Sequence, residues 1–345
     1  MPAAAASKFR GRPDFSCSAA LLLLLLAACG AGKKVVKPYD LGIPAAQQAD
    51  DYVAAESPKA VRGSRRVVIP YFQVEFVQQS AAEAAGGNYK TGGPISTTSS
   101  KTVVTLTGVD ARQFQAIADD FYDAVLADLK VAGMEVVPFE QLRTAPEYQT
   151  LAGHGFKASP DRVENRDNIS LFYAPHGMQI YYLPADPRLT GQAVGKKGNT
   201  LGSGLSAFMG VMKSTYGGAA YNYADEEKAL AKALDAKALR VRVVVDFADV
   251  GASADGYHDA TASTKVRLSF AADDSFYAFV SGDGEARFSL KQPLVSGDSF
   301  AEKKRDTFST GPWEAAADGK AYEATVRKHL EVFRQMMMAK VVASR

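Results

Sequence analysis

The alternation of apolar and polar residues predicts a strand near the start of the folded part of the chain. Residues 67–78 are rich in Val, Ile, Phe and Tyr, and their middle part alternates in the order Phe72, Gln73, Val74, Glu75 and Phe76. Pro70 lacks a backbone donor and predicts an edge position or a local break. Residues 80–100 are small and polar and predict a loop, after which 101–107 resumes as a strand. We therefore expect a hairpin around a long insertion.

Large apolar residues three and four positions apart predict a helix over 111–132, with Phe114, Ile117, Phe121, Val125 and Leu129 on its buried side. Asp110 is a suitable N-cap, Gln113 completes a capping box, and Gly133 is a suitable C-terminal stop. A closing helix is predicted over 321–342, with its apolar side formed by Tyr322, Val326, Leu330, Phe333 and Met337.

The remaining pattern completes an α/β prediction. Shorter helices are expected over 45–55, 139–151 and 226–238, and short strands over 134–138 and 179–183. Four further strands with short Gly- and Asp-rich links follow, over 240–250, 264–271, 275–281 and 286–291. Such links predict an antiparallel meander. The expected fold class is α/β, or mixed α+β: a mixed sheet with an antiparallel C-terminal meander, packed by helices.

Composition and charge narrow the functional classes. The chain has 345 residues, of which 47% are hydrophobic and 23% charged, so it is not a disordered protein. Its formal net charge of +2 is the charge of residues 1–28 alone, through Lys8, Arg10, Arg12 and Asp14. The rest of the chain is close to neutral, which removes the simplest argument for nucleic-acid binding, and no nucleic-acid partner is expected.

The first 28 residues have the pattern of a secretory signal peptide. A positively charged start is followed by the apolar stretch 19–28, which includes six consecutive leucines at 21–26. A membrane-spanning helix needs roughly 20 apolar residues, so this stretch is too short to be a stable anchor. We expect residues 1–28 to be removed after export.

The junction Leu26-Ala27-Ala28-Cys29-Gly30 resembles the lipobox of bacterial lipoproteins. The resemblance implies that the Cys29 thiol receives a diacylglycerol, that cleavage occurs just before it, and that the new amino terminus is acylated, typically with palmitate. The alternative is an ordinary signal peptide with an incidental Cys29. Because Cys17 leaves with the signal, Cys29 is the only cysteine of the mature chain, which fits lipidation. Since Gly30 is not Asp, the resemblance implies the outer membrane, facing the periplasm, ahead of the inner membrane or the cell surface.

The expected organisation is a signal peptide at 1–28, a lipidated tether at 29–63, and a single periplasmic α/β domain at 64–345 with a Gly-rich insertion at 152–224. The tether is rich in Gly and Pro, and its Lys33, Lys34 and Lys37 are either headgroup contacts or ordinary solvated charges. Over about 65–340, the order of elements resembles that of the curli-secretion pore lipoproteins and of the amino-terminal domains of TolB-type envelope proteins.

Candidate chemistry is sparse along the chain. The four histidines, His154, His176, His258 and His329, lack metal-site spacing. Asp255, His258 and Asp259 are either a cation site or a polar hairpin tip. Residues 191–197 are one residue short of a phosphate loop, and 202–207 match a relaxed dinucleotide fingerprint without a strand before it. We therefore expect no catalytic, cofactor or metal site; the one predicted site residue is Cys29, as the lipid attachment point.

Three functions are compatible with this sequence. The favoured one is a lipid-anchored, non-catalytic binding or scaffolding module of the cell envelope, with a protein or glycan partner and the membrane as its anchor. The second is an oligomeric secretion or assembly pore subunit, to which the 73–107 hairpin supplies spanning strands. The third is an envelope hydrolase with a dispersed active site near His154 and His176.

Overall fold

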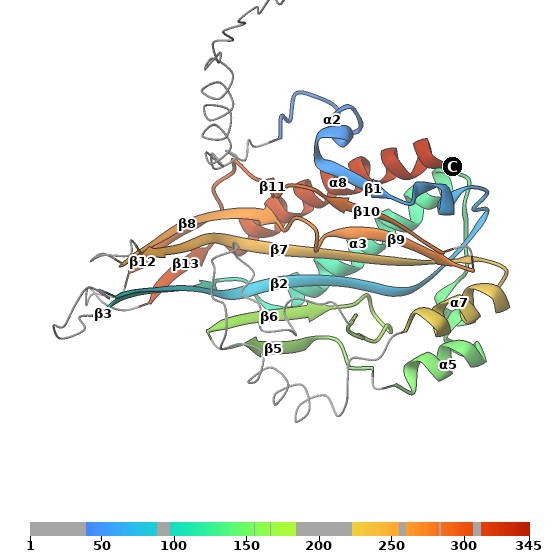
Figure 1. Ribbon diagram of the computed structural model, residues 1–345, viewed down its shortest axis with the longest axis horizontal. Helices are drawn as coiled ribbons and strands as arrows, with labels where there is room; N and C mark the ends of the chain where they lie inside the picture. Colours follow the sequence, from blue (N-terminus) through green and yellow to red (C-terminus); the bar gives the residue numbers. More distant parts are fainter. Residues whose placement is uncertain are drawn as a thin grey trace, which may run out of the picture. The chain divides into compact units, whose positions relative to one another are not determined.

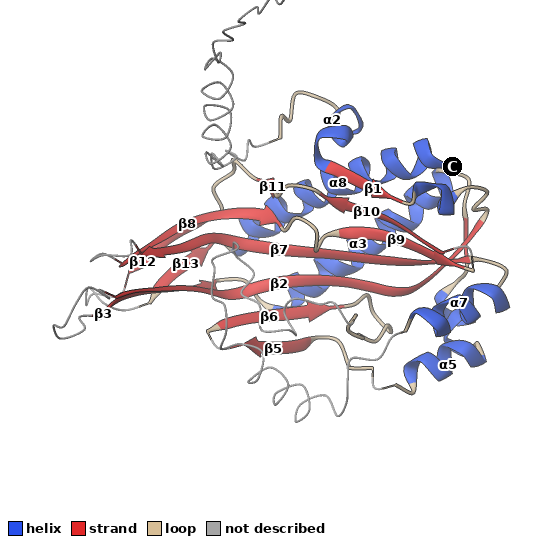
Figure 2. Ribbon diagram, viewed as in Figure 1, coloured by secondary structure: helices blue, strands red, loops and turns tan. Residues whose placement is uncertain are grey.

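A computed structural model describes residues 39–87, 97–154, 156–165, 167–183, 223–254, 260–282, 284–305 and 312–345. Residues 38–345 form one compact unit with the expected mixed α/β architecture (Figures 1 and 2). The predicted signal peptide, Cys29 and the middle of the predicted Gly-rich insertion lie outside the described residues. Within the described part, no helix has both the length and the apolar character needed to cross a bilayer.

A single mixed sheet runs through the unit, and its main path has the strand order β1-β10-β9-β7-β2-β3-β13-β12. The strands of this path are β1 (Val53–Glu56), β2 (Arg66–Gly87), β3 (Thr97–Thr107), β7 (Lys237–Ala254), β9 (Phe276–Ser281), β10 (Gly284–Leu290), β12 (Ala301–Arg305) and β13 (Trp313–Ala317). The shorter branches are β4 (Glu135–Val136), β5 (Asp161–Asn165), β6 (Asn168–Tyr173), β8 (Ala260–Phe270) and β11 (Leu294–Val295). β2 and β7 pair in parallel at the centre.

Helices cover both faces of the sheet to different extents. The long helices α3 (Ala111–Val131) and α8 (Gly319–Ser344) pack on one face, together with α2 (Ala45–Tyr52) and the turn η2 (Pro58–Val61), and they enclose the larger apolar core. On the other face, α4 (Phe139–Thr144), α5 (Pro146–Ala152) and α7 (Ala224–Ala233) enclose a smaller cluster at one end (Figure 1). The rest of that second face carries the polar residues described below.

The strongest periodic signals in the sequence are confirmed. α3 begins with the expected capping box: Gln113 N donates to Asp110 Oδ1 at 3.0 Å, and Asp110 N donates to Gln113 Oε1 at 3.1 Å. Gly133 follows α3 with a φ of 72°, a left-handed conformation that glycine adopts without strain. All five predicted apolar positions of α3 are buried, as are those of α8.

Pro70 marks a break in the centre of the sheet. Val68 pairs with Ala238 and Tyr71 with Arg240, so three steps along β2 match two along β7. One extra residue is thus accommodated at the proline, which cannot donate to the ladder. The predicted local break is confirmed. β2 lies inside the sheet, but Pro70 falls between its pairing with β4, which ends at Val67, and its pairing with β6, which starts at Val74.

The expected tether extends too far into the chain. Residues 39–63 belong to the folded unit: α2 packs against α8, and β1 pairs antiparallel with β10. Tyr39, Ala49, Tyr52, Val53 and Val61 are buried in the larger core. These apolar residues are scattered among Gly, Pro and charged positions, so no local period reveals them. Contacts with α8, β9 and β10 make them core. The part that remains outside the described residues ends at residue 38.

The expected polar loop at 80–100 is mostly strand. β2 continues to Gly87 and β3 starts at Thr97, with Gly87 paired to Thr97, so the predicted hairpin is confirmed but its strands are longer. Ala, Ser and Gly, which make up most of these positions, give little strand signal by themselves. Their strand conformation depends on pairing across the hairpin, a context that sequence propensity does not capture.

The C-terminal strands are antiparallel, as predicted, but they are not a simple meander. β8 and β9 both pair with β7, one after the other along the same edge, and a break at 271–275 separates them. Val244 N donates to Ser275 Oγ at 3.1 Å across this break. The predicted 139–151 helix is likewise divided into α4 and α5 at Pro146, and the predicted strand at 179–183 is reduced to a bridge between Ile180 and Lys157.

Candidate functional site

Two arginines point from the first third of β7 to the face of the sheet opposite α3 and α8. Arg240 and Arg242 alternate with Leu239, Val241 and Val243, which face the larger apolar core. Both arginines are buried. Together with their carboxylate partners Glu75, Glu227 and Glu285 they form a set that we call the buried charged row.

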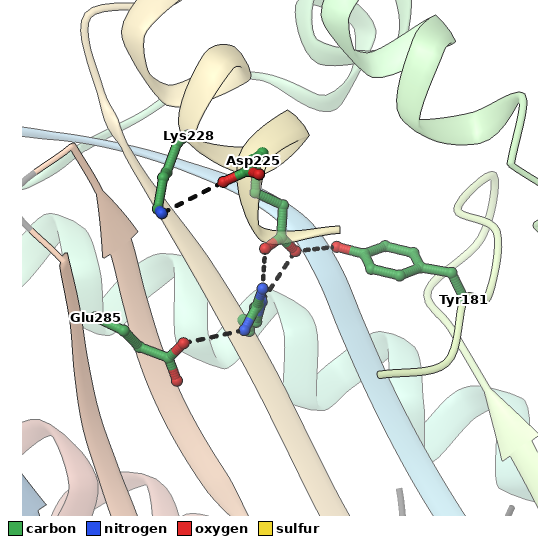
Figure 3. Close-up of polar contacts among 6 residues, drawn as sticks. Tyr181, Asp225, Lys228 and Glu285 are labelled. Carbon is green, nitrogen blue, oxygen red and sulfur yellow. Dashed lines mark hydrogen bonds and ion pairs between the residues drawn. The ribbon is translucent and has the colours of Figure 1, made fainter. Parts of the chain in front are cut away.

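Arg240 lies between two carboxylates that come from different elements. Its Nε donates to Glu227 Oε1 at 2.9 Å and its Nη2 also donates to Glu227, in a two-point contact. Its Nη1 lies 3.2 Å from Oε2 of Glu285 on β10. Tyr181 completes the arrangement, because its hydroxyl donates to Glu227 Oε1 at 2.6 Å. Figure 3 shows Tyr181 and Glu285 approaching the central guanidinium–carboxylate pair from opposite sides.

The electrostatics of this group follow from its burial. Burial lowers the pKa of Arg240, but the hydrogen bonds and negative charge of Glu227 outweigh it, and the net pKa is raised above the ordinary value. Burial, and then the neighbouring Glu227 charge, hold the pKa of Tyr181 well above 10. Arg240 therefore stays charged, and Tyr181 stays a protonated donor. Glu227 also lies in the first turn of α7, where the helix dipole favours a negative charge.

The second arginine joins three strands. Arg242 Nη2 donates to Glu75 Oε2 at 2.9 Å, and Ser170 Oγ on β6 donates to Glu75 Oε1 at 2.7 Å. Glu75 is fully buried in β2. Beside it, Tyr71 donates its hydroxyl to Gln73 Oε1 at 2.6 Å. The polar groups of β2, β6 and β7 are thus matched to one another inside the unit.

The row reaches solvent at Glu285, whose side chain is 38% exposed. A shallow groove of about 400 Å³ lies near this end, between α7 and the β9–β10 turn. Its lining residues include Lys228, Lys232, Asp235 and Gly282. Two residues after Glu285 on β10, the guanidinium carbon of Arg287 lies 3.6 Å from the centre of the Phe276 ring.

Chemically, the row is suited to fixing the fold. Each buried carboxylate is held by an arginine and a hydroxyl donor. Removing one partner of such a pair leaves an uncompensated buried charge. A slip of one residue in β7 would also turn both arginines into the apolar core under α3 and α8. The row therefore specifies the register of β7 against β2 and α7.

The histidines proposed for a hydrolase site pair with separate carboxylates. His154 Nε2 lies 3.9 Å from Oε1 of Glu226 on α7, whereas His176 Nε2 lies 3.1 Å from Oδ2 of Asp119 on α3. His329 is buried in α8, with its ring 5.2 Å from that of Tyr39. Among the described residues, no group of three or more His, Cys, Asp or Glu side chains is arranged to hold a metal ion.

Several predicted positions lie outside the described residues: Cys29, Asp255, His258, Asp259, 191–197 and 202–207. The buried charged row, in turn, was not predicted from the sequence. The sequence does contain a signal for this row. Arg240 and Arg242 are charged residues on either side of Val241 in a mostly apolar stretch, and Glu75 lies between Val74 and Phe76. Charges on the alternate face of a buried strand need buried partners.

Comparison with protein-family models, with curated proteins and with solved structures finds no significant match for this chain.

Proposed function

We propose that this protein is a lipid-anchored cell-envelope protein whose folded unit is a non-catalytic binding or scaffolding module on the periplasmic side of the outer membrane. The lipobox-like junction at Cys29 supports the anchor. The folded unit supports the binding role through two projecting hairpins, which we call the two arms.

Both arms are continuations of the central strands. The first arm is the part of β2 and β3 paired from Gln79–Thr105 to Gly87–Thr97, and the second is the part of β7 and β8 paired from Ala248–Val266 to Ala254–Ala260. At this end the strands run beyond α3 and α8 (Figure 1). The arms pack on each other, and the Thr102 and Thr264 hydroxyls share a hydrogen bond of 2.9 Å.

This extension is the observation that carries the proposal. A two-stranded hairpin is marginally stable in water by itself, and here the two arms support each other where they continue past the helix-covered core. Their side chains are mainly Ala, Ser, Thr and Gly. Such arms offer backbone and small polar groups for contact with a partner protein or glycan.

The anchor is tested by replacing its attachment point. In bacteria that produce the protein, Cys29→Ala should move the folded unit from the membrane fraction to the soluble periplasm and leave its thermal unfolding unchanged. A Cys29→Ala protein that stays with membranes after a carbonate wash would contradict the anchoring proposal.

A second candidate is a pore subunit, and the full length of two outer strands favours it. Membrane-spanning strands need about 9–11 residues, and β3 and β8 have 11 residues each, of which 97–105 and 260–266 belong to the arms. Against it, the two arms pack face to face through the Thr102–Thr264 contact. A shared pore wall would require the arms to separate and pair with neighbouring copies. This candidate requires a closed oligomer, whereas the binding module does not.

A further inference from the structure

The turn at the start of the folded unit presents two large aliphatic side chains to solvent. Leu41 is 56% exposed and Ile43 is 43% exposed. In the described part of the chain, the other large hydrophobic side chains with comparable exposure are Val131 and Val342, near the ends of α3 and α8. Leu41 and Ile43 are two residues apart, and together they form a small exposed apolar patch.

This turn is held rigidly by a side chain beneath it. The Gln48 side chain, which is buried, donates to Asp40 O at 2.7 Å and to Ile43 O at 2.8 Å, and it accepts from Asp40 N at 3.0 Å. Tyr39 and Ala45, which flank the turn, are buried in the larger core. The flanks are therefore fixed, and Leu41 and Ile43 cannot turn inward without breaking the contacts of Gln48.

The length of the chain between Cys29 and the turn indicates that the membrane covers the turn. Leu41 is 12 residues after Cys29. A fully extended chain of that length spans about 40 Å, and a flexible one has a root-mean-square length of roughly 20 Å. If Cys29 carries the lipid, as proposed above, the turn is confined near the bilayer surface. A weak contact is then sufficient, because the anchor makes the encounter intramolecular.

We propose that the turn 40–43 docks on the phospholipid bilayer, with Leu41 and Ile43 inserted at the boundary between the headgroups and the acyl chains. The proposal rests on the lipid anchor. Among the described residues around the turn there is no excess of positive charge: Asp40 and Asp51 are exposed, Asp50 is paired with Lys340 at 2.6 Å, and Lys291 donates to the Asp50 backbone carbonyl at 2.5 Å. The contact is therefore apolar, and a zwitterionic bilayer provides all that it needs. It orients the folded unit on the membrane.

The experiment uses the full-length acylated protein, reconstituted into phosphatidylcholine vesicles, with a fluorophore that brightens in apolar surroundings attached at Leu41→Cys. The matched control carries the same label at Val131→Cys, because Val131 is 90% exposed and lies at the end of α3. Cys29 is blocked by its lipid in both proteins. We expect a several-fold brighter, blue-shifted signal at position 41, quenched by spin-labelled lipid and unchanged in high salt, with no such change at position 131.

A third protein tests the apolar contact itself. Adding Ile43→Glu to the Leu41→Cys protein should return its fluorescence to that of the control, and because Ile43 is exposed, the fold should be unaffected. Two outcomes overturn the docking proposal alone. In the first, the protein floats with the vesicles but the fluorescence of its label at position 41 equals that of the control. In the second, the label at position 131 is quenched by spin-labelled lipid as strongly as the label at position 41. A protein that does not float overturns the anchor and the docking together.

Discussion

Glu227 provides the sharpest test of the buried charged row. Replacing Glu227 with Gln removes the charge that faces Arg240 and leaves that buried guanidinium with the half-exposed Glu285 as its remaining carboxylate contact among those described above. Breaking a buried pair from one side costs about 3–5 kcal/mol. Because Glu285 still compensates part of the charge, we expect a loss of about 3 kcal/mol for Glu227→Gln, at the lower end of that range.

The double replacement separates pairing from burial. Arg240→Met alone should also destabilise, since it leaves the Glu227 carboxylate buried beside Tyr181. Glu227→Leu combined with Arg240→Met removes both charges, and such replacements by apolar residues of similar size are often close to neutral. Adding Tyr181→Phe removes the hydroxyl that would otherwise lose its acceptor. We therefore expect the combined variants to be more stable than either single one.

Urea unfolding followed by far-ultraviolet circular dichroism measures these differences, with the slope against urea checked for constancy. The matched control is Asp225→Asn on the same helix, whose 3.5 Å contact with Lys228 is exposed and should contribute under about 1 kcal/mol. Two results would show that the buried pair does not behave as described: Glu227→Gln costs no more than the control, or the Glu227→Leu, Arg240→Met variant is no more stable than either single variant.

Three further predictions concern a histidine, two glycines and the arms. Burial lowers the pKa of His329, so below about pH 6.5 the unfolded chain binds more protons than the native one. The free energy of unfolding should therefore fall with decreasing pH, by up to about 1.4 kcal/mol per pH unit. His329→Gln should remove this component, as measured by urea titrations at pH 7.5 and 5.5. Gly108→Ala should cost more than about 2 kcal/mol of stability, because φ is 81° and the new Cβ would lie 2.2 Å from a carbonyl oxygen of β13. Gly133→Ala has open space around the new Cβ and should cost about 1–2 kcal/mol, from its φ of 72° alone. Thermal unfolding should show the larger loss for Gly108→Ala, and equal losses would contradict the clash. Thr102→Val should cost about 1 kcal/mol by removing the contact with Thr264, and it should speed amide exchange in both arms; unchanged exchange would mean that the arms do not depend on each other.

The sequence predicts the elements whose signal is local. α3 is one such element, because its five apolar positions and its capping box lie within a single run of residues. The arms and the first core residues could not be predicted this way. The small residues of 80–87 are strand because β3 pairs with them, and Tyr39 is core because α8 covers it. In both cases the deciding contact is distant in sequence.

The buried charged row illustrates the same limit for the site. Arg240 and Arg242 carry a readable signal as inward-facing charges, but their partners do not. Glu75 is 167 residues from Arg242, and the choice of Glu227 rather than the adjacent Glu226 depends on how α7 is rotated against the sheet. Sequence alone can indicate that buried partners exist, and the fold is required to say which ones they are.

We propose that a lipid on Cys29 anchors a binding module, and native mass spectrometry of the full-length protein, extracted from membranes in mild detergent, tests both parts of this proposal. We expect a monomer whose first residue is Cys29 and whose mass includes the acyl chains. A closed oligomer of acylated chains would replace the binding module with the pore subunit. A species without acyl mass would contradict the anchor on which the account depends.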